Sequence, residues 1–178
     1  MQKTGPHIPV SYAARDARTI GEMFTTRCVR SGPLPAILEK RNGAWITTTW
    51  SEFYHQAAQV AQGLIDAGLK RGDRVAILGP TQASWAIYDM GSQLAGMVSF
   101  GVYPKQTVEQ IGYLLDHSDA KVVFVEGEGE LENVLTAVSK NALVTPSSPI
   151  GSGTTSSRNS APSLTSKSSQ RVGPSTSA

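Results

Sequence analysis

The sequence lacks a second cysteine, a histidine cluster and any apolar run long enough to cross a membrane. Because Cys28 is the only cysteine, no disulfide can form within the chain. His7, His55 and His117 are scattered, with no spacing that resembles a zinc site. The first residues contain no apolar stretch of signal-peptide length. These absences predict a metal-independent cytoplasmic protein and leave peripheral association with a membrane surface open.

Acidic and aromatic residues are missing from the last part of the chain. All 14 Asp and Glu lie at or before Glu132, and the last aromatic residue is Phe124. Residues 139–178 hold 13 Ser, 5 Thr, 4 Pro and 4 basic residues, whereas residues 1–138 carry 12 basic and 14 acidic residues, a net charge of −2. A segment of this composition cannot bury a core, so we predict a disordered tail over residues 139–178. An acidic body with a sparsely basic tail also argues against nucleic-acid binding.

Three motifs of common catalytic folds are also absent. No Gly-Lys pair occurs, which excludes the phosphate loop of P-loop nucleotide-binding proteins. The segment LGPTQAS has a single Gly79 beside Pro80 where a dinucleotide-binding fingerprint would need several glycines. No GxSxG motif is present for a serine nucleophile of the α/β-hydrolase type.

An Asn-Gly pair at residues 42 and 43 divides the segment PAILEKRNGAWITTTW into two short strand-like parts. Because these residues tolerate positive φ angles, we predict a β-hairpin at about 36–48. Thr49 and Glu52 have the spacing of a capping box, which marks the start of a helix. Apolar residues then recur every three or four positions up to Ile65, which predicts an amphipathic helix over roughly 51–67, ended by Gly68.

Beyond Gly68, three continuous apolar segments are typical of strands covered on both faces: RVAILG at 74–79, MVSFGVY at 97–103 and KVVFV at 121–125. Helical patterns separate them. We expect Ser84 to cap one helix, and Thr107 with Gln110 to start another that ends near His117. The loop EGEGE leads into a last helical pattern, LENVLTAV. This alternation predicts an α/β fold with a mostly parallel sheet and flanking helices.

The ordered succession of WITTTWSEF and RGDRVAILGPTQASWAIYDMGSQLAGMVSFGVYPKQTVEQIGYLLDHSDAKVVFVEGE resembles the amino-terminal region of AMP-forming acyl-CoA synthetases. Within that superfamily it is most similar to long-chain fatty acid–CoA ligases. The resemblance covers residues from about Ile20 to Ala137, and Lys105 departs from the small hydroxyl residue usual after that proline. It implies an incomplete amino-terminal portion of the adenylate-forming large domain.

The resemblance also implies a reaction. In the family, a carboxylate attacks the α-phosphate of ATP to form an acyl-adenylate, and coenzyme A then displaces AMP. ATP, Mg²⁺ and coenzyme A are therefore implied for the complete enzyme, with a fatty acid as substrate. The family's catalytic parts lie downstream of the region that matches, so no catalytic, cofactor-binding or metal-binding residue is assigned in this chain.

Part of the tail resembles the family's phosphate loop, which reads SGTTG followed by Pro and Lys. Ser152 to Thr155 fit, but Ser156 replaces the glycine, and Arg158 and Asn159 stand at the proline and lysine positions. Because 18 of the 40 tail residues are Ser or Thr, we interpret the match as coincidence.

Other candidate sites have simpler structural interpretations. His117 and Asp119 could form an acid/base pair, although a histidine at a helix end more often compensates the helix dipole. The cluster of Glu126, Glu128, Glu130 and Glu132 could hold a cation or form a solvated loop. Trp85, Tyr88, Met90 and Leu94 could line an acyl channel, but their helical spacing favours a core. Cys28 has no activating neighbour in sequence.

The chain is thus divided into an N-terminal extension (1–19), a partial synthetase domain (20–138) and the Ser-rich tail (139–178). Two origins of the tail remain open: a flexible, phosphorylated extension, or translation out of frame after a ligase sequence stops near Ala137. We favour the second. Two functions also remain open, a truncated ligase fragment that is catalytically incomplete or a non-catalytic interaction module on the same scaffold.

Overall fold

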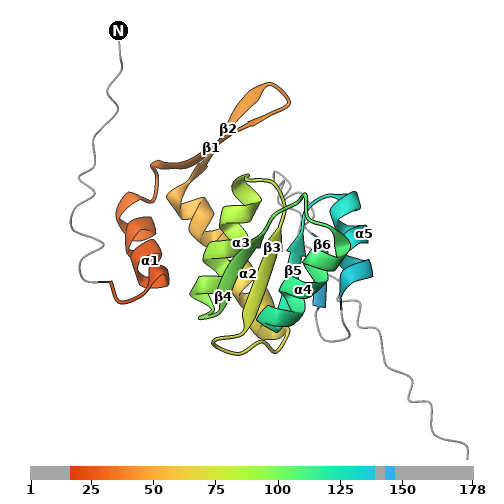
Figure 1. Cartoon of the computed structure of the whole chain (residues 1–178). Helices are drawn as coiled ribbons and strands as arrows, with labels where there is room; N and C mark the ends of the chain where they lie inside the picture. Colours follow the sequence, from red (N-terminus) through yellow and green to blue (C-terminus); the bar gives the residue numbers. More distant parts are fainter. Residues whose placement is uncertain (1–16, 139–142, 147–178) are drawn as a thin grey trace, which may run out of the picture.

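The computed structural model describes residues 17–138 and 143–146. These residues form five α-helices and six β-strands in two separate sheets (Figure 1). In chain order the elements are α1 Ile20–Ser31, β1 Pro35–Arg41, β2 Ala44–Thr49, α2 Trp50–Asp66, β3 Arg74–Leu78, α3 Ala83–Leu94, β4 Val98–Val102, α4 Val108–Ser118, β5 Ala120–Val125, α5 Glu128–Ala137 and β6 Leu143–Pro146.

Strands β1 and β2 form the predicted antiparallel hairpin. Lys40 pairs with Trp45 and Arg41 with Ala44, so the two-residue turn consists of Asn42 and Gly43. Their φ angles are +50° and +84°, as a tight hairpin turn requires. In Figure 1 the hairpin projects away from the remaining elements.

The second sheet is parallel, with the strand order β4-β3-β5-β6. Alternate residues of its central strands face opposite helical layers, because successive side chains of a strand point to opposite faces. Ala76, Leu78 and the adjacent positions of β5 pack under α4 and α5. Val75 and Ile77 pack against residues of α2 and α3 on the other face. The predicted α/β fold with a parallel sheet and flanking helices is confirmed.

Helix α1 was not predicted from the sequence. Thr19 caps its first turn, because its side chain accepts a hydrogen bond from the backbone N–H of Glu22 at 3.1 Å. Phe24 and Cys28 are the apolar residues that the helix buries, in a cluster with Phe53 and Ala57 of α2. The spacing of Thr19 and Glu22 matches the helix-start signal that was used elsewhere in the chain.

The two predicted capping boxes are confirmed at Thr49 and Thr107, where hydrogen bonds run in both directions with Glu52 and Gln110. The prediction that Ser84 caps α3 is wrong. Helix α3 begins at Ala83 after Gln82, whose side chain makes no capping hydrogen bond. Ser84 lies inside the first turn and instead donates to the Glu126 carboxylate at 2.8 Å.

Strand β6 extends the sheet beyond residue 138, within the segment expected to form a disordered tail. Its four residues pair in parallel with Val122 to Val125 of β5. This strand was not predicted from the sequence. Within the described ranges, no helix is long and apolar enough to cross a membrane.

Candidate functional site

The parallel sheet contains a point where its connections change direction. The chain passes from β3 through α3 to β4 on one side of β3, then through α4 to β5 on the other side. In open α/β sheets of this kind, ligands bind outside the carboxyl ends of the strands at the point of reversal. The carboxyl ends of β3 and β5 are therefore the place to look for a site.

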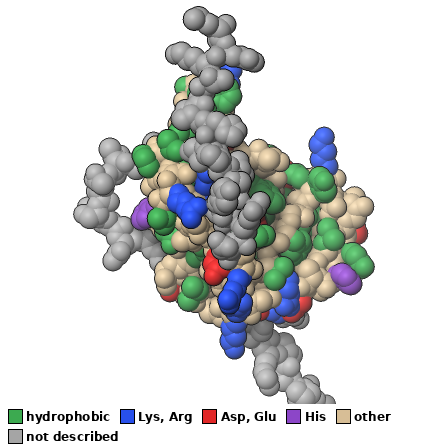
Figure 2. All heavy atoms as spheres, turned by 90° about the vertical axis from the view of Figure 1, so that its left-hand side faces the viewer, with side chains coloured by type: hydrophobic (Ala, Val, Ile, Leu, Met, Phe, Trp, Pro, Cys, Tyr) green, Lys and Arg blue, Asp and Glu red, His purple; other side chains and the backbone are tan. Residues whose placement is uncertain are grey.

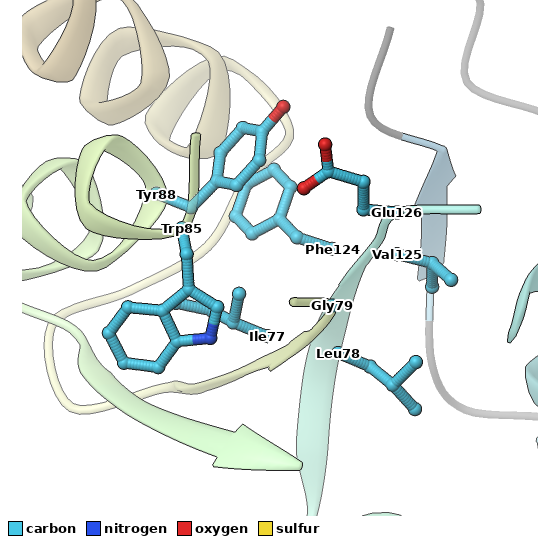
Figure 3. Close-up of a pocket in the computed structure, with 8 residues that line it drawn as sticks. All are labelled: Ile77, Leu78, Gly79, Trp85, Tyr88, Phe124, Val125 and Glu126. Atoms are coloured by element: carbon cyan, nitrogen blue, oxygen red, sulfur yellow. The ribbon is translucent and has the colours of Figure 1, made fainter. Parts of the chain in front are cut away.

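A hollow lies at this point and is lined by residues from β3, α3 and β5 (Figure 3). We call it the switch-point hollow; its lining consists of Ile77, Leu78, Gly79, Trp85, Tyr88, Phe124, Val125 and Glu126. The rings of Tyr88 and Phe124 stack with centroids 4.3 Å apart and planes inclined by 10°. The Glu126 carboxylate is directed toward this aromatic pair in Figure 3.

The switch-point hollow is narrow, and Glu126 is the one charged residue in its lining. The empty space in and around the hollow amounts to about 160 Å³, which includes open solvent. No part of the hollow itself is wide enough to enclose a water molecule. Its carboxylate, Glu126, accepts a hydrogen bond from Ser84. A Cβ added at Gly79 would lie 3.0 Å from the Cβ of Glu126, so close packing fills the space between the two strand ends. The contact between Ser84 and Glu126 joins residues 42 positions apart and has no local sequence signal.

The acidic cluster does not form a cation site in the part of the chain that the structure describes. No three His, Cys, Asp or Glu side chains there lie close enough together to hold a metal ion. Glu128 and Glu130 lie in the first turn of α5. The helix therefore begins within the segment EGEGE, which was predicted to be a loop. Carboxylates in this position interact favourably with the helix dipole.

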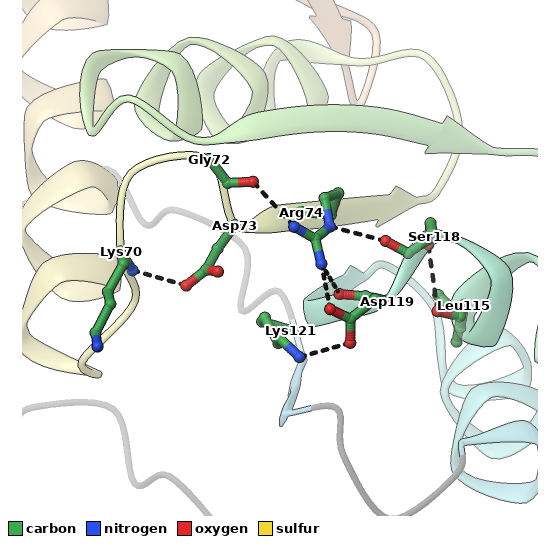
Figure 4. A network of polar contacts seen from close by, with 8 residues as sticks. All are labelled: Lys70, Gly72, Asp73, Arg74, Leu115, Ser118, Asp119 and Lys121. Carbon is green, nitrogen blue, oxygen red and sulfur yellow. Dashed lines mark hydrogen bonds and ion pairs between the residues drawn. The ribbon is translucent and has the colours of Figure 1, made fainter.

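His117 and Asp119 take part in different contacts. The His117 ring stacks on Tyr113 one turn earlier in α4, with centroids 5.4 Å apart. Asp119 caps the end of α4 with a φ angle of +51° and forms ion pairs with Arg74 and Lys121 (Figure 4). Its hydrogen bond to Lys121, then the nearby positive charges, hold the pKa of the Asp119 carboxyl below its usual value. These contacts give Asp119 a structural role.

The four residues considered for an acyl channel divide between two clusters. Trp85 and Tyr88 pack with the sheet, whereas Met90 and Leu94 pack in the cluster of Phe24, Phe53 and Ile87. The interpretation as core residues is confirmed. Cys28 is buried in that second cluster, and its burial raises the pKa of the thiol to about 11 despite the nearby Arg27. A thiol of this pKa is a poor nucleophile at neutral pH.

The chain and its fold are similar to those of known proteins. The family model for AMP-binding enzymes matches residues 24–176. The chain belongs to this family. The AMP-binding match continues past residue 138 through most of the Ser-rich segment, including Ser152 to Thr155, which lie outside the described residues.

Long-chain fatty acid–CoA ligases are among the relatives of this AMP-binding family member. The chain is 32% identical over 118 residues to ACSBG2 of Rattus norvegicus, and 30% identical over 118 residues to ACSBG1 of Bos taurus. Each alignment covers 66% of this chain but only 18% and 16% of the respective ligase. The chain therefore spans less than a fifth of the length of these relatives.

The fold is shared with solved enzymes. A benzoate CoA ligase from Burkholderia xenovorans LB400 superimposes with a TM-score of 0.65, at 20% sequence identity. The superposition covers 75% of this chain and 27% of that enzyme. At this identity the similarity shows the fold alone, and the described elements correspond to part of an adenylate-forming domain.

Proposed function

We propose that this chain is the amino-terminal scaffold of an AMP-forming long-chain fatty acid–CoA ligase and does not catalyse the reaction by itself. The alignment with ACSBG2 carries the proposal, because it joins 66% of this chain to 18% of a ligase. The complete enzyme would activate a fatty acid with ATP and Mg²⁺ and transfer the acyl group to coenzyme A.

The switch-point hollow does not fit ATP or coenzyme A. The switch-point hollow is too narrow for a water molecule, whereas small-molecule sites typically enclose about 300–1,000 Å³. Within residues 17–138 and 143–146, no group of three candidate metal ligands occurs. No catalytic step is therefore derived from these residues.

Equilibrium dialysis with radiolabelled ATP and Mg²⁺ tests whether the scaffold binds nucleotide. We expect no saturable binding to the purified chain, and binding to a full-length long-chain fatty acid–CoA ligase measured in parallel. Saturable, stoichiometric binding to the chain would contradict the proposal.

The encoding nucleotides test the origin of the tail. If residues 139–178 are translated out of frame, another reading frame beyond the codon for Ala137 should encode the downstream motifs of a ligase. Absence of those motifs from both other frames would contradict this origin.

A second candidate function is a non-catalytic interaction module. Strand β4 lies at one end of the sheet, and Val98 at its start is 54% exposed. Unpaired edge strands can add a strand from a partner. The side of the molecule shown in Figure 2, by contrast, has apolar side chains interspersed with polar and charged ones. Protection of β4 amides from hydrogen exchange by a purified partner would support this function, whereas recovery of chaperones alone would contradict it.

A further inference from the structure

The turn end of the β1–β2 hairpin has little apolar support. At its base, Ala36 and Ile37 pack against the cluster that joins α1, α2 and α3. From Asn42 to Thr47 every residue is exposed, and Trp45 retains 68% of its accessible surface. The position of this end must therefore depend on few contacts.

Glu39 reaches from β1 to the start of α3. Its Oε1 accepts a hydrogen bond from the backbone N–H of Ala83 at 3.2 Å, across 44 residues of sequence. Its second carboxylate oxygen pairs with Arg41, so both oxygens are engaged. Ala83 is the first residue of α3, and the preceding Gln82 makes no capping hydrogen bond.

This contact replaces a local helix cap. The first backbone N–H groups of a helix have no partner within the helix, and a nearby negative charge also interacts favourably with the helix dipole. The Glu39 carboxylate meets both requirements from another element. It also links the hairpin to the segment that carries Trp85, which lines the switch-point hollow.

We propose that Glu39 is a positioning residue that latches the turn end of the hairpin, residues 40–46, to the start of α3. The latch couples two elements that share no strand pairing. Losing the contact releases the hairpin end and the first turn of α3 together, while the parallel sheet keeps its structure.

Two substitutions remove the contact from opposite sides. Glu39→Ala deletes the acceptor. Ala83→Pro deletes the donor N–H without changing the hairpin, and proline is well tolerated at the first position of a helix. Gln82 has φ −142° and ψ −179°, which suits a residue before proline. Glu128→Gln, at an exposed glutamate in the first turn of α5, is the matched control.

Residue-resolved amide hydrogen exchange of the full chain gives the readout. We expect amides of the hairpin end and of residues 84–88 to exchange about fivefold faster in either variant, the effect typical of losing one helix cap. The double variant should show no further increase, because both changes remove the same contact. Glu39→Gln, which retains an acceptor oxygen, should restore part of the protection.

Three results would overturn the proposal. Ala83→Pro could leave hairpin exchange at the wild-type rate, the two effects could multiply in the double variant, or β5 amides could accelerate by the same factor. Should Ala83→Pro fail to fold, Glu39→Ala decides alone: wild-type exchange at residues 83–88 would refute the latch, and faster exchange confined to that turn and the hairpin would support it.

Discussion

Arg74 at the start of β3 and Asp119 at the end of α4 are joined by an ion pair and by a backbone contact (Figure 4). The Arg74 guanidinium donates to the carbonyl oxygens of Ser118 at 2.8 Å and Asp119 at 3.2 Å. Carbonyl groups at the end of a helix lack partners within it, so one side chain closes α4 and fixes it to the central strand. Asp119 itself adopts the left-handed conformation that often follows the last turn of a helix.

Replacing Arg74 should destabilise the fold. We expect Arg74→Ala to lower the free energy of unfolding by about 1–2 kcal/mol, because charge-assisted hydrogen bonds are lost at a partly exposed site. Arg74→Lys should restore only part, since lysine lacks the planar fork of donors. Urea denaturation measures both. Lys70→Ala is the control, because Lys70 contributes its backbone N–H to the neighbouring turn; equal losses in Arg74→Ala and this control would contradict the assigned role.

Acid should weaken the same contact. The pKa of Asp119 is lowered in the folded chain, chiefly by its hydrogen bond to Lys121. Its stabilising contribution is therefore complete above the pKa of the unfolded state and is lost as the pH falls through the lower, folded value. We expect the urea midpoints of wild type and Asp119→Asn to differ at pH 7 and to converge as the pH falls below the lowered, folded pKa of Asp119. A difference that stays constant over this range would contradict the assignment.

Gly91 allows α3 to approach α2 closely. A Cβ at this position would lie 2.6 Å from the Cβ of Val60 and 2.8 Å from the carbonyl oxygen of Ala57. We expect Gly91→Ala to cost roughly 1–3 kcal/mol of unfolding free energy through overpacking. Gly63→Ala is a matched control, because a Cβ at this position would meet nothing within 4 Å. This substitution should stabilise α2 by about 0.5–1 kcal/mol, since glycine is less favourable than alanine inside a helix. Thermal denaturation measures both effects. A change in stability of the same sign in the two variants would contradict this packing.

Thr49 is the clearest local determinant of a helix start. Its hydroxyl accepts from the backbone N–H of Glu52 at 3.2 Å, and the Glu52 carboxylate accepts from the Thr49 N–H at 2.7 Å. We expect Thr49→Ala to destabilise the chain by about 1 kcal/mol. Thr47→Ala, at an exposed strand position, should change the unfolding free energy by less than about 0.5 kcal/mol. An effect of Thr49→Ala no larger than that of Thr47→Ala would contradict the capping role.

Local signals explain which parts of the fold were predictable. Asn42 and Gly43 determine the hairpin turn through their own backbone preferences, and the box of Thr49 and Glu52 involves residues three positions apart. The error at Ser84 has the opposite origin. Its hydroxyl bonds Glu126 rather than its own helix, because folding brings β5 beside α3.

The candidate site depends on contacts between residues far apart in the sequence, which local patterns do not predict. The pairing of Glu39 with the Ala83 N–H, and the switch-point hollow itself, depend on strand order and not on spacing along the chain. Helix α1 was not predicted although Thr19 and Glu22 carry a helix-start signal, because Phe24 and Cys28 are the only apolar residues that it buries. Strand β6 was not predicted because its short run of Leu143, Val144 and Thr145 ends at a proline and lies in a serine-rich segment.

A pyrophosphate-release assay tests the central claim most directly. The purified chain is incubated with a long-chain fatty acid, ATP, Mg²⁺ and coenzyme A, beside a full-length ACSBG2 as positive control. The account predicts no release above the enzyme-free blank from this chain and clear release from the control. Sustained release that depends on both the fatty acid and this chain would contradict the account, because it would place a complete active site within these 178 residues.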